Sequence, residues 1–156
     1  ELIKVIEDKK IPHRFLSKGD VIKLQDGIKI DFLFPSSDLM LENLNNTSVV
    51  CKISWGEAEV LLTGDLEAGV HDSIISEDIE AEVLKVPHHC SNDALDARLL
   101  VAVQPEYSVI MVGRDNKFGH PTKACLNYLK ETEVYRTDRD GDINFQLSFD
   151  SIVPLN

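Results

Sequence analysis

The residues best suited to chemistry lie directly after expected strands. Asp65 follows the apolar run 59–63 and a glycine, and the pair His88 and His89 follows the run 81–86 and a proline. In α/β proteins ligands bind beyond the carboxyl ends of the strands. A carboxylate can bridge two cations, and a histidine can bind a metal ion or transfer a proton. These positions therefore indicate a metal-dependent or acid–base site.

Each of these signals also has a purely structural interpretation. Gly-Asp sequences are common in turns, so Asp65 alone is a weak signal. Adjacent histidines point in different directions, and we therefore expect at most one of His88 and His89 to bind a metal directly. The other would orient substrate or donate a proton. The position of the pair after a strand, downstream of a strand-end aspartate, favours a functional role.

A third signal is the sequence NKFGHP, which contains Asn116, Gly119 and His120 and leads into an expected helix. A histidine there could bind an anion together with the N-terminus of the helix, or it could cap or pack. Asn46 and Ser48 enter an expected hairpin and, taken by themselves, form a polar turn.

Three cysteines are an odd and sparse set, so no disulfide framework is expected. Cys90 could be a soft metal ligand or a reactive thiol, although a small buried residue is the more ordinary interpretation. Cys51 on a strand and Cys125 on a helix are expected in the core. His13 and His71 are expected at the surface.

The apolar periodicity predicts the framework that positions these residues. Strands are expected at 14–16, 21–24, 28–34, 48–55, 59–63, 81–86, 107–112, 134–137 and 143–149, and helices at 1–8, 67–76, 93–103 and 121–131. Asp93 and Pro121 are expected to open their helices, and 138–142 to be a hairpin turn that lacks the spacing of a calcium loop. The order predicts one layered α/β domain with a mixed sheet.

Composition and charge narrow the classes of protein. The chain has 156 residues, 43% of them hydrophobic, and a net charge of −11. Disorder, collagen and coiled coil are excluded, and no apolar run approaches the ~18 residues needed to span a bilayer. Residues 57–82 hold nine acids and no Lys or Arg, whereas 83–125 hold five bases and four acids. The charge argues against binding nucleic acid through a basic surface.

Taken in order, the runs LLTGD, VLKVPHH, NKFGHP and YRTDRDGD resemble one family. They are similar to the C-terminal metallo-β-lactamase-like domain of the ComEC competence proteins, which are bacterial DNA-internalisation proteins. The resemblance extends from about Arg14 to Phe149. It implies a metallo-β-lactamase-like αββα sandwich, a metal-dependent phosphodiester hydrolase (nuclease-like) activity, and DNA as the partner of the parent protein.

The resemblance also implies roles for individual residues. Asp65 matches the bridging metal ligand and His89 the later histidine ligand. His88 and His120 match positions near the metals or the substrate and are the candidate catalytic residues. The candidate substrate-binding positions are Asn46, Ser48, Asn116 and Gly119; the first two lie where better-known relatives place another histidine ligand.

Two departures from the family pattern are evident. Cys90 replaces the usual glycine after His89. The main metal motif of the superfamily, H-x-H/D-x-D-H, is absent from this sequence. We therefore expect residues 1–156 to be a single, partial domain, with about 90–100 residues of a domain of ~250 missing.

A complete domain would hold two divalent ions, Zn²⁺ or Mn²⁺, whereas this chain alone is expected to be inactive and to have too few ligands to bind metal tightly. An exposed sheet face predicts pairing with another copy. The parent resembles an integral membrane protein of the bacterial envelope, and this segment is expected to be a soluble domain. A stand-alone hydrolase of another phosphate ester and a degenerate binding or assembly module remain alternatives.

Overall fold

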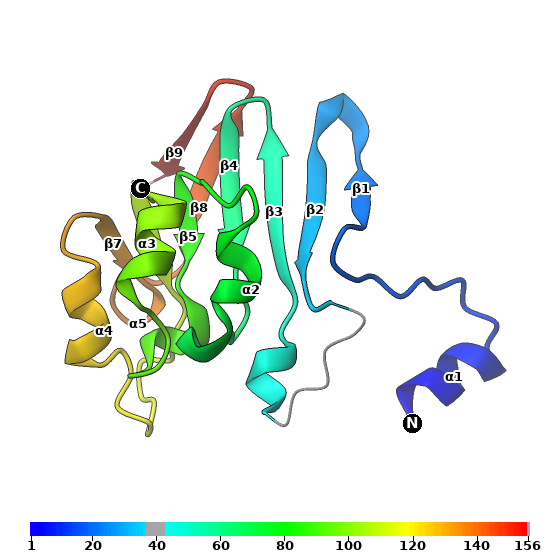
Figure 1. The fold of residues 1–156 in the computed structure, drawn as a ribbon, viewed down its shortest axis with the longest axis horizontal. Helices are drawn as coiled ribbons and strands as arrows, with labels where there is room; N and C mark the ends of the chain where they lie inside the picture. Colours follow the sequence, from blue (N-terminus) through cyan, green and yellow to red (C-terminus); the bar gives the residue numbers. More distant parts are fainter. Residues whose placement is uncertain (37–42, 156) are drawn as a thin grey trace.

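The computed structural model describes residues 1–36 and 43–155. Within them a seven-stranded sheet has the strand order β1-β2-β3-β4-β5-β6-β7 (Figure 1). Strands β1 to β4 are antiparallel and β4 to β7 are parallel, which confirms the predicted mixed sheet. The strands are β1 Val21–Lys23, β2 Lys29–Phe34, β3 Val50–Trp55, β4 Ala58–Leu62, β5 Val83–Lys85, β6 Tyr107–Ile110 and β7 Glu133–Arg136.

Helices cover one face of this sheet (Figure 1). The α-helices are α1 Leu2–Asp8, α2 Asp72–Ile75, α3 Ala97–Val103, α4 Lys123–Tyr128 and α5 Thr137–Asp140, and the 3₁₀ turns are η1 Gln25–Gly27, η2 Leu44–Thr47, η3 Ala68–Val70 and η4 Pro87–Cys90. Leu61, Leu84 and Ile110 of the parallel strands are fully buried against Ile74 of α2 and Leu99 of α3. Burying each such side chain contributes about 1.5–3 kcal/mol, so this layer anchors the strands that lead into the site.

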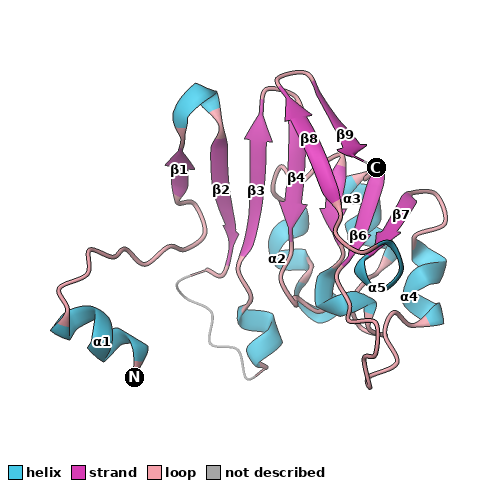
Figure 2. Cartoon of the chain, turned by 180° about the vertical axis from the view of Figure 1, so that it is seen from behind, coloured by secondary structure: helices cyan, strands magenta, loops and turns pink. Residues whose placement is uncertain are grey.

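A two-stranded hairpin, β8 Asn144–Ser148 and β9 Ser151–Leu155, lies on the other face of the sheet (Figure 2). Its Ile152 packs with Val83 and Tyr107. The hairpin turn predicted at 138–142 is wrong. Strand β7 pairs in parallel with β6 and does not pair with β8, which pairs with β9 instead. The helix α5 lies between β7 and β8.

The hairpin leaves part of this second face open. Phe32, Cys51 and Leu62 are partners across β2, β3 and β4, and all three side chains are only half-buried. Figure 2 shows β8 and β9 over the parallel half of the sheet, with β1 to β3 uncovered. Cys51, expected in the core, thus lies on this partly open face.

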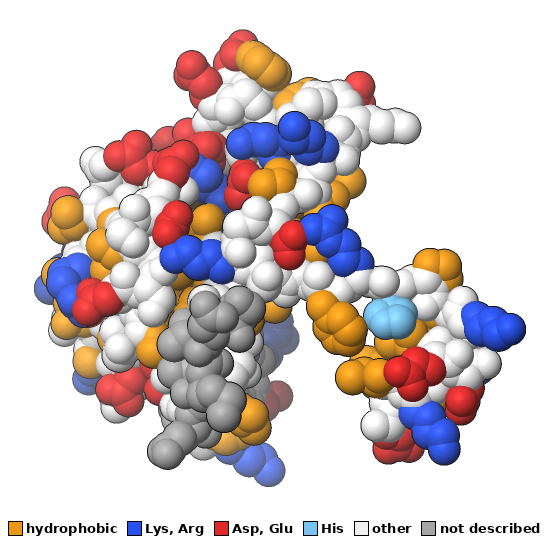
Figure 3. Space-filling model, turned by 45° about the vertical axis from the view of Figure 1, so that its right-hand side comes forward, with side chains coloured by type: hydrophobic (Ala, Val, Ile, Leu, Met, Phe, Trp, Pro, Cys, Tyr) orange, Lys and Arg blue, Asp and Glu red, His pale blue; other side chains and the backbone are white. Residues whose placement is uncertain are grey.

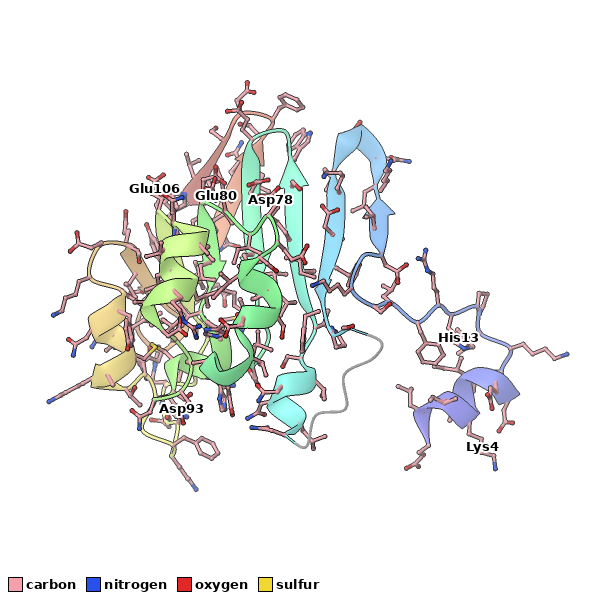
Figure 4. All side chains as sticks on the ribbon, viewed as in Figure 1. Lys4, His13, Asp78, Glu80, Asp93 and Glu106 are labelled. Carbon is pink, nitrogen blue, oxygen red and sulfur yellow. A yellow bond between two sulfur atoms is a disulfide. The ribbon has the colours of Figure 1, made fainter. Side chains whose placement is uncertain are left out.

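Helix α1 forms as expected, but none of its residues is buried. It stands apart from the sheet on an extended segment, and Figure 3 shows it as a separate lobe. Figure 4 labels His13 on that segment, beside the helix. The expected strand at 14–16 does not form. Residues 37–42 of the expected polar loop lie outside the described residues.

Two helix starts differ from the sequence prediction because other residues cap them. The side chain of Asp96, rather than Asp93, accepts a hydrogen bond from the Leu99 amide at the start of α3. Thr122 caps α4, which begins at Lys123 rather than at the preceding proline. His71 was expected at the surface and is instead completely buried.

Candidate functional site

The loops that follow the four parallel strands meet at one end of the sheet. Strand β3 runs antiparallel to β4, so the segment that precedes β3 reaches the same end. In Figure 4, Asp93 lies near this lower end, whereas Asp78, Glu80 and Glu106 lie near the opposite end. The topology therefore gathers every candidate residue predicted from the sequence at one edge.

Asp65 is positioned by a turn that only a small residue permits. Gly64 has φ +56°, and a Cβ added there would lie 2.7 Å from the Cβ of Ser48. The Ser48 hydroxyl accepts a hydrogen bond from the Asp65 amide at 2.9 Å. Ser48, predicted as a substrate-binding residue, thus holds the backbone that carries the aspartate.

His89 faces Asp65. Its Nδ1 lies 2.6 Å from the carbonyl oxygen of Met111, to which it donates, and its Nε2 lies 3.8 Å from Oδ2 of Asp65. A histidine that donates its Nδ1 proton to a carbonyl keeps a lone pair on Nε2, which is the tautomer that metal-binding histidines use. Asp65 and His89 therefore present two donor atoms to one point.

His88 faces a different set of groups, as expected for adjacent histidines. Its Nε2 lies 3.5 Å from Nδ2 of Asn45, and its Nδ1 lies 3.5 Å from Oε1 of Glu67 and 3.3 Å from the Ser91 hydroxyl. Its amide also donates to the carbonyl of Gly64 at 3.3 Å, which ties the two strand-end loops together.

The backbone of the histidine turn is strained and braced. His88, His89 and Cys90 have φ of 42°, 52° and 61°, a conformation that costs roughly 1–2 kcal/mol per non-glycine residue. Cys90 forms a disulfide with Cys125 of α4, and its carbonyl accepts a hydrogen bond from the Thr122 amide.

The disulfide contradicts the expectation that none would be present, and it excludes a free thiol or a metal ligand at Cys90. The buried positions predicted for Cys90 and Cys125 are confirmed. Cys51 is the cysteine left over. The two partners are 35 residues apart and meet only because α4 starts behind the histidine turn.

Glu67 and Asn45 belong to the site but were missed in the sequence. The Glu67 carboxylate accepts hydrogen bonds from Asn45 at 2.9 Å and from Asn43 at 2.8 Å, and its amide donates to Oδ1 of Asn46. Glu67 lies two residues after Asp65, and Asn45 directly precedes Asn46, so their positions beside predicted site residues were the available signal. Asn46, like Ser48, supports the backbone.

Lys85 is a further missed residue. Its ammonium donates to the carbonyl of Gly64 at 2.6 Å and lies 3.9 Å from Oδ1 of Asp65. Burial lowers the pKa of Lys85, and the nearby Asp65 carboxylate opposes that shift. The positive charge therefore sits beside the carboxylate that was predicted to bind metal.

His120 is held by its own loop. Asn116 accepts a hydrogen bond from the His120 amide at 3.0 Å and donates to the His120 carbonyl at 2.8 Å, and Gly119 supplies a φ of +74°. The His120 ring lies 6.2 Å from that of His88 between centroids. Burial lowers the pKa of His120, and the neighbouring histidines add to the effect. His120 was expected directly before the start of the helix. Thr122 caps α4 instead, so His120 lies two residues before the cap.

A cavity of about 460 Å³ adjoins these residues. Its lining includes both histidine loops and the end of β6: His89, Met111, Val112, Phe118, His120 and Thr137. The polar groups in its wall are largely engaged, since the Thr137 hydroxyl accepts from the amide of Val112 and donates to its carbonyl, both at 2.8 Å.

The donor set is too small for a complete metal centre. Among residues 1–36 and 43–155 no group of three or more His, Cys, Asp or Glu side chains is arranged to hold a metal ion. Catalytic zinc sites use three protein ligands and structural ones four. Asp65 and His89 fit the chemistry of such a site, but within the described residues they supply only part of it.

The chain is similar to known competence proteins. The chain is 34% identical over 127 residues to competence protein ComA of Neisseria gonorrhoeae, covering 78% of this chain and 18% of that protein. It is 30% identical over 135 residues to ComE operon protein 3 of Bacillus subtilis, covering 84% of this chain and 17% of that protein. The chain thus spans less than a fifth of the length of these relatives, and no family model matches it.

The fold is similar to that of solved structures. A protein of Parabacteroides distasonis assigned as a metal-dependent hydrolase aligns with a TM-score of 0.52 at 13% identity, covering 85% of this chain and 60% of that one. A Thermotoga maritima protein assigned as a zinc-dependent hydrolase of the metallo-β-lactamase superfamily aligns with a TM-score of 0.50 at 14% identity, covering 80% of this chain and 72% of that one. In the described part of the chain, no helix has the length and apolar character to cross a membrane.

Proposed function

Since the chain is a ComEC-like domain with the metallo-β-lactamase fold, we propose that it is the C-terminal part of a metal-dependent phosphodiester hydrolase domain that acts on DNA in bacterial competence. The observation that supports this most is the pair Asp65 and His89, whose donor atoms lie 3.8 Å apart beside two further histidines. In this proposal the remaining ligands come from residues outside the described ranges.

The proposal assigns distinct tasks to the residues of this end. Asp65 and His89 would be two of the ligands of a divalent ion, Zn²⁺ or Mn²⁺, which would supply an activated water and charge neutralisation for the phosphodiester. His88 or His120 stabilises the developing charge or donates a proton to the leaving oxygen. Asn46, Ser48, Asn116 and Gly119 shape the loops that present these groups to substrate.

The acidic composition is compatible with a nucleic-acid substrate in this proposal. A bound cation, rather than a basic surface, would meet the phosphate. The stretch of sequence that carries the site histidines is also less acidic than the rest of the chain, because residues 83–125 carry five bases against four acids. The parent would be a membrane protein of the cell envelope, with this segment outside the bilayer.

The test is hydrolysis of single- and double-stranded DNA with Mn²⁺ or Zn²⁺. We expect no turnover by the 156-residue chain alone, because its described residues supply two ligands. A polypeptide that adds the half carrying H-x-H/D-x-D-H should cleave DNA, and Asp65→Asn or His89→Gln should reduce its rate by at least about 100-fold. Asp72→Asn, at a highly exposed carboxylate, is the control.

Two outcomes would contradict the proposal. Robust cleavage by the 156-residue chain alone would show that the chain does not need ligands from another segment. A completed polypeptide that binds metal but cleaves no phosphodiester would favour the second candidate, a degenerate binding or assembly module. Lys85 is the observation that favours this candidate, because its ammonium near Asp65 opposes cation binding.

We also propose that the partly open sheet face around Phe32, Cys51 and Leu62 pairs with a second copy of the chain when nothing else covers it. Light scattering of the purified chain should then show a dimer, and Phe32→Glu should shift it to a monomer. A monodisperse monomer of the unaltered chain at high concentration would refute the pairing.

A further inference from the structure

The loop between β6 and α4 presents an aromatic ring to solvent. Phe118 is 82% exposed, compared with 74% for Phe15 and 59% for Phe149. Its neighbour Met111, at the base of the same loop, is 50% exposed. Large apolar side chains exposed next to a cavity mark binding sites more often than chance surface positions do.

The ring is presented in a defined orientation. It stacks on His120 with an interplanar angle of 13° and a centroid separation of 6.1 Å. The loop beneath it is closed by the Asn116 side chain, which bonds to the backbone of both Gly113 and His120. The loop backbone that carries Phe118 is therefore held in place, and its ring lies nearly parallel to that of His120.

The cavity beside Phe118 is suited to a flat apolar group. At about 460 Å³ it falls within the range of small-molecule pockets, and its wall is mostly apolar. Asn116 and Thr137 use their polar atoms within the protein, so Nε2 of His89 and the ring nitrogens of His120 are the main polar groups left in the wall. A mostly apolar wall beside an aromatic ring can accept the π-face of a base, as the aromatic platforms of single-strand-binding proteins do.

The loop that carries Phe118 has an excess of basic side chains. Arg114 and Lys117 are both exposed on the same loop, and Asp115 is the one acid between residues 111 and 122. An apolar ring flanked by two cations matches a nucleotide, whose base stacks and whose phosphates pair with the basic side chains.

We infer that Phe118, with Met111 and His120 beside it, is a stacking platform for an unpaired nucleobase next to the phosphodiester to be cleaved. The preferred substrate class is then single-stranded nucleic acid, because the bases of a duplex stack on one another and offer no free face. This inference rests on the proposed function, since it uses the same end of the sheet.

Fluorescence anisotropy of the full chain, without metal and at low salt, tests the platform. The probes are a labelled oligodeoxythymidylate of about 12 nucleotides and an abasic strand of equal length. We expect Phe118→Ala to weaken binding of the thymidylate strand about tenfold and to leave the abasic strand unchanged, while Phe118→Trp retains the affinity. Phe15→Ala, at another exposed phenylalanine, is the matched control.

The results separate this inference from the proposed function. Equal loss on both strands, no loss on either, or no binding by the unaltered chain would overturn the platform. If Phe118→Ala lowers only thymidylate binding while the completed polypeptide cleaves no DNA, the platform stands and the hydrolase proposal fails. If cleavage occurs and Phe118→Ala changes neither binding nor cleavage, the hydrolase stands without the platform.

Discussion

At their amino ends the strands β4 to β7 begin next to glutamates, whereas at their carboxyl ends the same strands lead into histidines, Asp65 and the basic loop. The glutamates are Glu59, Glu82, Glu106 and Glu133. Figure 4 shows Glu106, with Asp78 and Glu80, at the end away from Asp93. A row of glutamates thus marks the amino end, whereas the carboxylates of the site, Asp65 and Glu67, lie beside Lys85 and the site histidines. An acidic protein can in this way keep one end open to a polyanion.

The two ends also differ in backbone conformation. The carboxyl end contains three successive non-glycine residues with positive φ, a disulfide and a glycine packed against Ser48. Strained backbone persists only where surrounding structure enforces it, and it is concentrated at functional sites. This difference in backbone conformation therefore favours the carboxyl end as the location of the proposed site.

Removing the disulfide between Cys90 and Cys125 should have the largest effect on stability. We expect the double variant Cys90→Ala and Cys125→Ala to lower the free energy of unfolding by about 3–4 kcal/mol, because the disulfide closes a 35-residue loop. Urea unfolding measures the change. Cys51→Ala, which keeps the disulfide, is the control and should unfold like the unaltered chain. Adding dithiothreitol to this variant should lower its free energy of unfolding as much as the double substitution does. Unchanged unfolding in the reductant would contradict the disulfide.

The next effect comes from filling the space at Gly64. Gly64→Ala should cost about 2–3 kcal/mol, because it forces a side chain into a left-handed conformation and against Ser48. It should also shift the NMR signals of His88 and His89, since the Gly64 carbonyl contacts the histidine turn.

Gly56→Ala is the matched control at the opposite end. Gly56 also has positive φ, and a Cβ there would collide with the backbone of Phe149. It should destabilise the chain while leaving the histidine signals in place. If both variants moved these signals equally, the two ends would not be independent.

The sequence predicted those parts that depend on local pattern. Apolar runs located the seven strands of the main sheet, and the strand-end rule placed Asp65, His88 and His89 together. The sequence did not predict the features that depend on contacts between distant segments. Pairing partners are invisible in a single strand, so β8 was assigned to the wrong hairpin. Glu67 and Lys85 gained their roles from loops 20 or more residues away.

His71 illustrates the same limit. It lies away from the expected strand ends, which was the reason to predict a surface position. The ring is nevertheless fully buried, and neither ring nitrogen has a hydrogen-bond partner in the described part of the chain. Burial lowers the pKa of His71, and Asp96, 3.6 Å away, only partly opposes this.

A pH titration distinguishes this core histidine from those of the site. Because the folded pKa of His71 is lowered below the ordinary 6.5, its contribution to stability is present above that pH. The contribution is lost as the pH falls through the folded pKa, since the unfolded chain binds the extra proton. The slope contributed by one such group is at most about 1.4 kcal/mol per pH unit.

We therefore expect His71→Phe to flatten the dependence of urea unfolding on pH below 6.5, whereas His89→Gln, at a half-exposed ring that faces the Asp65 carboxylate, should leave the His71 slope in place. Replacing a buried ring that lacks hydrogen bonds with an apolar ring removes a desolvation cost, so His71→Phe should match or exceed the original stability at acidic pH. An unchanged slope would mean that the protonated His71 ring is compensated inside the core, and the contrast between core and site histidines would fail.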